Sequence, residues 1–419
     1  MMQGVRGIRD ILPAEVPHWR LLEETARRIF ALYACEEIRV PILEATALFT
    51  RAVGEATDIV EKEMYTFPDR GGESLSLRPE GTAVVVRSVV EHGLVRMPPC
   101  RVWYSGAMFR RERPQKGRYR QFHQIGCEFF GPESYQADVE VMDLILRLFD
   151  ELGLGQSVRL EINSLGCGEC RPPFRESLSA FLEGHREALC EDCRRRLERN
   201  PLRVLDCKVD GCRRVALEAP KMIEHLCPAC ESHFQGVERL LGAMGRSFRR
   251  NALMVRGLDY YTRTTFEVTT ELLGSQNAVA AGGRYDGLVG ALGGPATPAV
   301  GFALGMERVI LLLEGRQVPA VTPQVHLITL GAAAEEAGMA LAGELRQAGL
   351  RVDGGLMAGS LKSQMKRAGR GGAPWTVIIG EDEVVSGRVV LRRMDEGTQE
   401  TLGTTDAVSR LRQWAGTAI

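Results

Sequence analysis

The 419-residue sequence has no apolar run approaching the roughly 18 residues that a membrane-spanning helix needs. Its first ten residues, MMQGVRGIRD, lack the apolar core of a secretory signal, so we expect a protein that is not exported. Internal repeats and low-complexity segments are also absent. These absences argue against a membrane protein, a secreted protein and a repeat architecture, and the length predicts more than one globular domain.

The sequence also has almost no net charge, because 53 Lys and Arg residues are balanced by 54 Asp and Glu residues. Any binding of nucleic acid must therefore depend on local basic patches and not on the overall charge. Cysteine is present in an odd number, 11, in a chain without an export signal. This argues against a disulfide framework and predicts reduced thiols and a cytoplasmic location.

The densest basic segment is residues 110–120, which contain five Arg and one Lys against a single acid, Glu112. Pro114 and Gly117 disfavour a helix in this segment, so we expect a loop. A solvated surface loop is the ordinary interpretation of such a charge cluster. The residues on either side of the loop favour a different interpretation.

Residues 101–108 and 121–128 flank this loop and alternate as strands do, which predicts a long hairpin with a cationic tip. Gln124 and Glu128 share one face of the second strand, where polar groups must line a cleft or be buried at a cost. Guanidinium groups above a carboxamide and a carboxylate suit a polyphosphate bound above a polar small molecule. The hairpin is therefore a candidate ligand site.

Four other polar or glycine-rich strings stand out, and they are Arg78–Thr82, Arg256–Arg263, Val279–Gly287 and Val300–Val309. The first string, Arg-Pro-Glu-Gly-Thr, joins a strand to a helix, with Glu80 at the turn and Thr82 as the expected N-cap. The second is Arg-Gly-Leu-Asp-Tyr-Tyr-Thr-Arg, which is too polar for a plain core strand although residues 254–268 alternate. The glycines of the last two strings allow a ligand to approach the backbone closely.

The hairpin strings Phe-Arg-x-Glu and Arg-Pro-Gln-Lys-Gly-Arg-Tyr-Arg-Gln-Phe-His-Gln resemble motif 2 of class II aminoacyl-tRNA synthetases, in the form typical of histidyl-tRNA synthetases. The other strings resemble the histidine signatures and motif 3 of that family. A helix over 17–35, followed by a strand over 37–42, resembles motif 1, which forms the dimer interface there. The resemblance covers nearly the whole chain. It implies an α+β fold with an antiparallel sheet flanked by helices, acting as a homodimer.

The resemblance also implies a reaction in which L-histidine and ATP form histidyl-adenylate, and the histidyl group then passes to the 3′ end of histidine tRNA. Arg110 and Arg256 would be catalytic, because preorganised cations stabilise the charge that builds on phosphoryl oxygens. Mg²⁺ would bridge the ATP phosphates. The implied ATP-binding residues are Arg110, Arg113, Arg308 and Gly81. Arg113 could instead contact the tRNA acceptor end, together with Gln115.

The implied histidine-binding residues are Glu80, Thr82, Gln124, Glu128, Tyr260 and Tyr261, with Tyr285 as a further liner. A neutral imidazole has one donor and one acceptor nitrogen. Glu128 and Tyr261 would satisfy both, and any other amino acid would leave buried groups unpaired. Glu80 and Gln124 would hold the ammonium and carboxylate groups. For Tyr260, packing of the ring alone is the alternative.

The resemblance and the composition divide the chain into five segments. These are the first catalytic part (1–165), a helical cysteine-rich insertion (166–250), the second catalytic part (251–316), a linker (317–323) and a C-terminal α/β domain with parallel strands (324–419). In the resembling family the last domain reads the anticodon. Lys362, Lys366 and Arg370 are four residues apart and share one helix face, which is either solvated or faces RNA.

The insertion contains three Cys-x-x-Cys pairs and a looser fourth pair, which are Cys167/Cys170, Cys190/Cys193, Cys227/Cys230 and Cys207/Cys212. Two thiolates at this spacing reach one ion, and four complete a tetrahedral Zn²⁺ site. The first three pairs therefore predict a structural zinc that links the ends of the insertion, far from the chemistry. Reduced packing residues are the alternative, since the resemblance implies no metal. The sequence leaves open which pairs converge.

A second class of function is a non-catalytic paralogue, such as a regulatory subunit of ATP phosphoribosyltransferase, which resembles the catalytic domain alone. Such paralogues usually lack the C-terminal module and have degraded signature strings. Both features are intact in this sequence, which favours the ligase. A protein that only binds nucleic acid fits less well, because the net charge is near zero and the motifs resemble a pocket.

Overall fold

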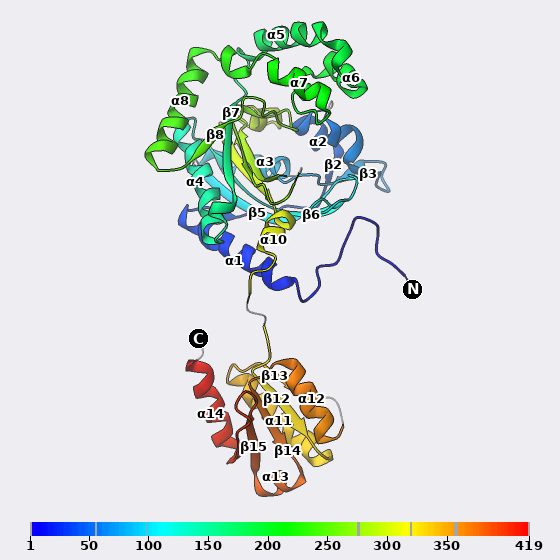
Figure 1. The fold of residues 1–419 in the computed structure, drawn as a ribbon, viewed down its shortest axis with the longest axis vertical. Helices are drawn as coiled ribbons and strands as arrows, with labels where there is room; N and C mark the ends of the chain where they lie inside the picture. The colour runs from blue at the N-terminus through cyan, green and yellow to red at the C-terminus, as the bar shows by residue number, and fades with distance from the viewer. Residues whose placement is uncertain are drawn as a thin grey trace. The chain divides into compact units, whose positions relative to one another are not determined.

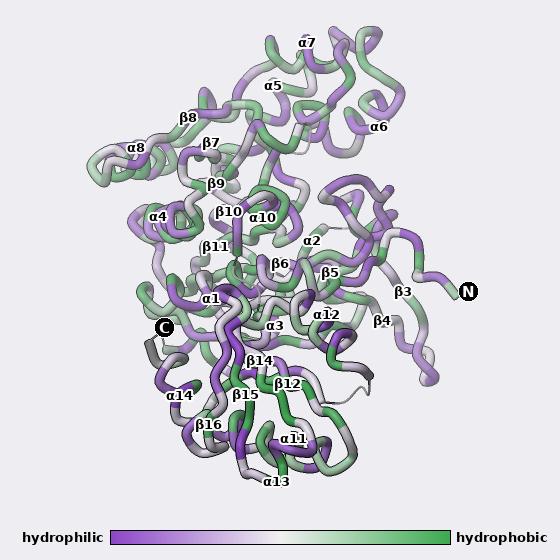
Figure 2. The backbone as a smooth tube through the Cα atoms, turned by 60° about the horizontal axis from the view of Figure 1, so that its bottom comes forward, coloured by the Kyte–Doolittle hydropathy of each residue, from purple (hydrophilic) through white to green (hydrophobic). Residues whose placement is uncertain are grey.

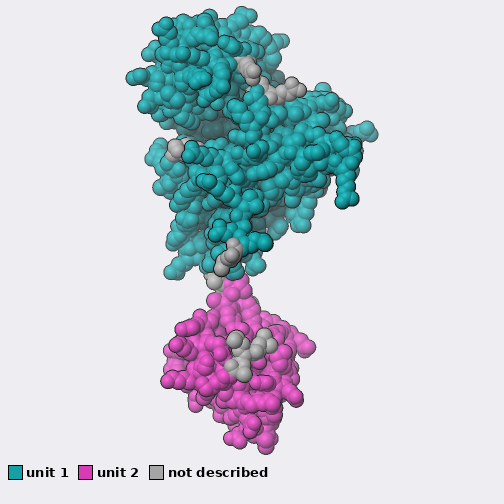
Figure 3. All heavy atoms as spheres, turned by 90° about the vertical axis from the view of Figure 1, so that its right-hand side faces the viewer, with its two compact units in different colours: residues 1–318 teal, residues 319–419 magenta. Residues whose placement is uncertain are grey.

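The computed structural model describes residues 2–54, 57–97, 99–274, 277–318, 321–355 and 359–417. The chain forms two compact units, Met1–Val318 and Pro319–Ile419, which are coloured separately in Figure 3. Residues 319 and 320 of the expected linker lie outside the described residues. In the described part of the chain, no helix is long and apolar enough to cross a membrane.

Among the described residues, the first unit is built on an eight-stranded sheet (Figure 1). Its order in space is β1-β5-β6-β11-β10-β9-β7-β8. The six inner strands pair antiparallel, whereas β1 and β8 pair parallel at the two edges. The strands are β1 (Glu36–Glu37), β5 (Cys100–Phe109), β6 (Gln121–Phe130), β7 (Arg159–Ser164), β8 (Phe248–Arg250), β9 (Thr262–Thr269), β10 (Ala278–Arg284) and β11 (Ala299–Gly305). The expected antiparallel sheet is confirmed.

The two faces of this sheet carry separate hydrophobic cores, and β6 contributes to both. Ile125, Cys127 and Phe129 pack into one core and Phe130 into the other, as strand alternation predicts. The first core is completed by α1 (Val16–Leu32), α4 (Tyr135–Glu151), α8 (Pro228–Ala243) and α10 (Met306–Leu313). The second is completed by α2 (Thr46–Val53), α3 (Thr82–Glu91) and α9 (Leu288–Ala291). Gln124 and Glu128 therefore belong to the face that α3 covers.

A small antiparallel sheet of order β2-β4-β3 precedes α3 and consists of β2 (Leu43–Ala45), β3 (Tyr65–Pro68) and β4 (Ser74–Leu77). The strand predicted over 37–42 is wrong beyond Glu37. There the buried guanidinium of Arg78 donates to the carbonyls of Val40 (2.9 Å) and Pro41 (3.2 Å). These carbonyls are therefore satisfied by a side chain instead of a neighbouring strand.

The insertion forms a third core around α5 (Arg171–Gly184), α6 (Glu191–Arg199) and α7 (Asp210–Glu218). The boundary predicted at residue 250 is wrong, because β8 is an edge strand of the main sheet. In addition, Phe234, Val237 and Leu241 of α8 pack into the main core. Residues 234–250 of the predicted insertion thus pack with the main sheet.

The second unit contains a mixed five-stranded sheet of order β13-β12-β14-β15-β16. Its strands are β12 (Val325–Thr329), β13 (Val352–Gly354), β14 (Trp375–Ile379), β15 (Arg388–Arg393) and β16 (Gln399–Gly403), and its helices are α11 (Ala332–Gln347), α12 (Leu361–Gly371), α13 (Glu381–Ser386) and α14 (Thr404–Thr417). Figure 2 shows hydrophobic residues along β12. The α/β class is confirmed, but the strands are not all parallel, because β15 pairs antiparallel with β14 and β16 pairs antiparallel with β15. The sequence interpretation missed α13 and β16.

Candidate active site

Glu128 lies at the centre of the site, with no exposed surface. Its Oε1 accepts a hydrogen bond from Thr82 Oγ1 (2.8 Å), and its Oε2 accepts one from the Tyr285 hydroxyl (2.5 Å). Burial raises the pKa of Glu128 to about 8. Gly301 of β11 lies opposite, and a Cβ there would come within 1.8 Å of Glu128 Oε2. The glycine thus provides space for the carboxylate.

Glu80 is also buried, at the N-terminus of α3. Its two carboxylate oxygens accept the backbone N–H groups of Thr82 (2.8 Å) and Ala83 (2.7 Å). Burial raises its pKa. The expectation that Thr82 caps the helix is wrong: Gly81 is the N-cap residue, and the Glu80 carboxylate satisfies the free amides. Thr82 is thereby free to bond Glu128.

Three tyrosines lie beside Glu128. The Tyr260 ring contacts the rings of Tyr261 and Tyr285, with centroids 4.7 Å and 5.6 Å apart. Burial raises the pKa of all three hydroxyls. The expectation that Glu128 and Tyr261 each contact one nitrogen of a bound imidazole stays a prediction, and in this structure the hydroxyl bonded to the Glu128 carboxylate belongs to Tyr285. All three tyrosines precede β9 or follow β10, and the string from Arg256 to Tyr261 is a loop, not the strand predicted there.

Arg256 lies over the Tyr261 ring at 4.9 Å and pairs with Glu267 at 2.6 Å. Its Nε is buried and has no hydrogen-bond partner among the described residues. The same holds for Oε1 of Gln124. Buried polar atoms without partners carry a free-energy cost, and a bound polar ligand would remove it. Sequence reasoning did not predict Glu267 as the ion-pair partner of Arg256. Strand alternation alone does not distinguish such a partner from an acid that faces solvent.

Arg110, Arg118 and Arg308 form a guanidinium cluster near the hairpin. Burial, together with the charges of Arg118 and Arg110, lowers the pKa of Arg308. Arg110 donates to the Pro79 carbonyl (2.8 Å), and Arg308 donates to the Gly117 carbonyl (3.4 Å). Close guanidinium groups repel one another, so a bound polyphosphate would stabilise the cluster. Arg118 was not among the expected site residues, although it lies in the basic loop.

A cavity of about 440 Å³ lies next to Arg256 and Tyr261. On the catalytic side it is lined by Arg256, Asp259 and Tyr261, and on the insertion side by Arg171 and Arg203. A cavity of this size, with apolar walls and several charged side chains, can hold a small molecule. The insertion therefore supplies one wall of the candidate site.

A buried ion network supports the site from behind. Arg284 has no exposed side-chain surface; it pairs with Asp138 and, at 3.0 Å, with Asp286. Asp138 Oδ2 lies 2.7 Å from His233 Nε2 on α8. Sequence reasoning missed this network, because its members come from distant segments.

The remaining expected site residues lie on the surface. Arg113 and Gln115 are exposed in the basic loop, and the backbone of Gln115 pairs with that of Arg118. Lys362 and Lys366 are exposed on α12, whereas Gln364 on the opposite face is buried. The expectation of one shared basic face on α12 is confirmed, and its contact with RNA stays a prediction.

Comparison with known proteins gives the family. The family profile described as Histidyl-tRNA synthetase matches residues 7–309, and the profile described as Anticodon binding domain matches residues 324–414. The chain belongs to the histidyl-tRNA synthetase family. A histidine–tRNA ligase of Trichlorobacter lovleyi is 54% identical over 95% of this chain and 94% of its own length. One from Geobacter metallireducens is 52% identical over 95% and 96%.

Solved structures agree with this family membership. The apo histidyl-tRNA synthetase of S. aureus superposes with a TM-score of 0.82 at 34% identity, covering 98% of this chain and all of that one. A Bacillus halodurans structure titled as an ATP phosphoribosyltransferase regulatory subunit/histidyl-tRNA synthetase has a TM-score of 0.65 at 20% identity, covering 91% of this chain and 98% of that one. The latter similarity shows the fold alone. The fold predicted from the family resemblance is confirmed.

Proposed function

We infer that this chain is a histidine–tRNA ligase, which activates L-histidine with ATP and transfers it to the 3′ end of histidine tRNA for protein synthesis. Relatives that are 54% and 52% identical in sequence over 95% of this chain carry that name. The observation in this chain that carries the inference is the buried carboxylate of Glu128 with its hydroxyl partners, together with the guanidinium cluster. No observation favours the regulatory paralogue.

Activation requires a histidine carboxylate to attack the α-phosphate, which brings two anions together. The chemistry needs fixed positive charge at the phosphoryl oxygens and no covalent intermediate with the protein. Arg110 and Arg256 are our candidates for the α-phosphate, and Arg308 for the leaving pyrophosphate. The free Nε of Arg256 supports the first assignment. To these we add Arg118, because its charge acts on Arg308.

Aminoacyl-tRNA synthetases generally use ATP with Mg²⁺, and we propose that this chain also binds ATP with Mg²⁺, which would supply positive charge to the phosphates. Gly81 would allow the nucleotide to approach the backbone, and Arg113 would contact either ATP or the tRNA acceptor end with Gln115. Lys362 and Lys366 would contact the tRNA. The homodimer and the cytoplasmic location expected from the sequence remain proposals.

For histidine, we propose that Glu128 accepts an imidazole N–H and that a tyrosine hydroxyl donates to the other nitrogen. Tyr261 is our candidate for this role, because the Tyr285 hydroxyl already donates its only proton to Glu128. The buried Oε1 of Gln124 has no hydrogen-bond partner among the described residues, which supports a contact between this oxygen and the ammonium group of histidine. Glu80 would act on the ammonium with its remaining lone pairs, since each oxygen already accepts one amide.

ATP–pyrophosphate exchange tests this function, because it measures activation without tRNA. We expect exchange that depends on L-histidine, and aminoacylation of histidine tRNA by the same preparation. Arg308→Ala should reduce exchange, whereas Arg70→Ala, an exposed arginine in the β3–β4 turn, should not. Arg113→Ala separates its two candidate roles, because a residue that contacts only tRNA would leave exchange intact. Exchange with other amino acids at equal rates would refute the proposal.

A further inference from the structure

The insertion brings eight cysteines into two groups that the sequence alone did not define. The first group is Cys167, Cys170, Cys227 and Cys230, and the second is Cys190, Cys193, Cys207 and Cys212. Within each group all four sulfur atoms lie within 4.8 Å of one another. The first two Cys-x-x-Cys pairs along the chain, at 167–170 and 190–193, thus fall into different groups.

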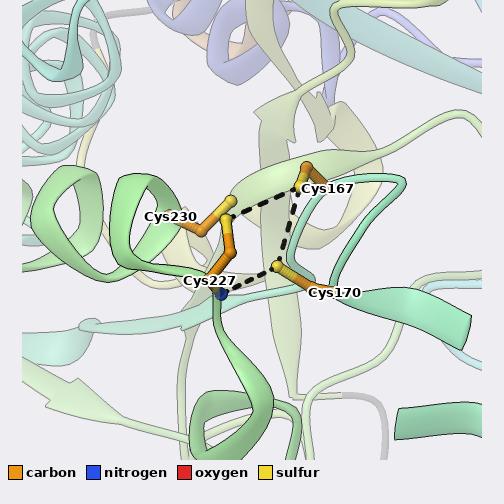
Figure 4. Close-up of side chains that lie close together, drawn as sticks. All are labelled: Cys167, Cys170, Cys227 and Cys230. Carbon is orange, nitrogen blue, oxygen red and sulfur yellow. Dashed lines mark hydrogen bonds between the residues drawn. The ribbon is translucent and has the colours of Figure 1, made fainter. Parts of the chain in front are cut away.

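The sulfur separations match a tetrahedral metal site. Cys167 Sγ lies 3.6 Å from Cys170 Sγ and 3.8 Å from Cys227 Sγ (Figure 4). In the second group, the Cys190 and Cys207 sulfurs are 3.9 Å apart. Four sulfurs about 2.3 Å from a central Zn²⁺ stand about 3.8 Å apart. A disulfide needs about 2.05 Å, and all these cysteines are free thiols.

In the first group, helix N-termini point at the sulfurs. Cys170 is the N-cap residue of α5, Cys227 is the N-cap residue of α8, and Cys230 is in the first turn of α8. The Cys227 amide donates to Cys170 Sγ at 3.1 Å. Helix N-termini and amide donors both favour the thiolate, which is the form that binds metal.

The second group repeats this arrangement on different helices. Cys190 is the N-cap residue of α6, with Cys193 in the first turn, and Cys212 is in the first turn of α7. The Cys190 amide donates to Cys212 Sγ at 3.1 Å. Simple packing of small apolar residues would not require the same amide–sulfur contact twice. Such contacts to ligand atoms are typical of metal sites.

The core of the insertion gives a reason for such sites. Four of its buried side chains are cysteines of these groups, Cys170, Cys193, Cys212 and Cys230. The remaining core is small, and small cores commonly need a metal or covalent link for stability. The first group joins Cys167 to Cys227 across 60 positions, so it closes the insertion on itself.

We propose that each group binds one Zn²⁺ through four thiolates, which gives two structural zinc ions per chain. Binding releases the thiol protons to solvent, and the metal–ligand bonds contribute to the folding free energy of the insertion. Four sulfur ligands leave no open coordination position, so neither ion takes part in the reaction.

These sites border the candidate active site, which corrects the expectation that a zinc would lie far from it. Arg171 directly follows Cys170, and its guanidinium donates to the Tyr261 carbonyl. Arg203, between the two halves of the second group, donates to the Arg256 carbonyl (3.4 Å) and to Asp58 (3.2 Å). The zinc sites therefore hold the insertion wall of the cavity in position.

Elemental analysis of the full chain, purified without a metal-affinity tag and passed over a chelating resin, tests the proposal. We expect close to two zinc ions per chain. Cys100→Ser, which lies in β5 outside both groups, is the matched control and should retain both ions. A loss of zinc in this control would mean that the measured metal is not held by the two groups.

Double variants test the pairing. Cys167→Ser with Cys227→Ser removes two ligands of one group, so it should lose one zinc ion. Cys167→Ser with Cys190→Ser removes one ligand from each group, so it should lose both. The opposite pattern would mean that the two Cys-x-x-Cys pairs nearest in sequence share an ion, and it would overturn the proposal.

A measurement on the unaltered chain covers the case in which these variants fail to fold. Titration of the thiols with an organic mercurial, in the presence of a chromophoric zinc chelator, should release two zinc ions per chain. Release of less than about 0.2 zinc per chain, where closed sites hold close to one each, would refute both sites. Iron in place of zinc would refute the assignment of the metal. None of these results depends on ligase activity.

Discussion

Replacement of Glu128 by Gln should make the protein more stable relative to the wild type as the pH rises. Burial gives the Glu128 carboxyl a pKa of about 8 in the folded chain, against an ordinary value of 4.5. In the unfolded chain this group ionises near the ordinary value, while the folded chain holds the proton until about pH 8. In the wild type, the contribution of this group to the free energy of unfolding is therefore fully present below pH 4.5. It is lost as the pH rises toward 8.

The magnitude follows from the two pKa values. At about 1.4 kcal/mol per pH unit, ionising Glu128 costs the ligand-free protein up to about 5 kcal/mol across this window. Glutamine has the shape of the protonated acid and does not titrate, so the variant avoids this cost. The variant should match the wild type within about 1 kcal/mol near pH 4.5, since the uncharged groups have similar shapes.

Urea unfolding of the ligand-free full chain, followed by tryptophan fluorescence at about pH 5, 6, 7 and 8, measures the effect. The free-energy difference between variant and wild type should grow steadily over this range. Glu24→Gln, an exposed glutamate on α1, is the matched control and should show no such growth. A difference that stays constant from pH 5 to 8 would refute the reasoning, because it would mean that Glu128 is already ionised when folded.

Three other perturbations test separate parts of the molecule. Arg256→Ala should lower histidine-dependent exchange by about 100- to 1,000-fold with little change in histidine affinity, because its partner charge develops in the transition state; normal turnover with a raised KM would make Arg256 a binding residue only. Arg284→Ala leaves the buried Asp138 carboxylate without its guanidinium partner, although His233 remains beside it. The urea midpoint should therefore fall by an amount equivalent to about 3–5 kcal/mol. An unchanged midpoint would contradict the buried network. Deletion of 322–419 should weaken tRNA charging more than ATP–pyrophosphate exchange, and equal loss of both would indicate a folding or dimer role for this unit.

The sequence alone determined the fold class and the residues of the central hairpin. Strand periodicity in residues 121–128 predicted which side chains share a face, because alternation is a property of the local backbone. Pro114 and Gly117 fixed the loop for the same reason. The strings around Glu80, Arg256 and Arg308 indicated the family, because each is an uninterrupted segment.

Only the tertiary structure decided which distant groups meet. It assigned the Glu128 hydrogen bonds to Thr82 and Tyr285, and it brought Arg284 to Asp138. These partners come from segments far apart in the chain, and no local pattern encodes their approach. The same limit applied to the cysteines: the spacing predicted that they could bind metal, but the chain path between the pairs set which four sulfurs converge.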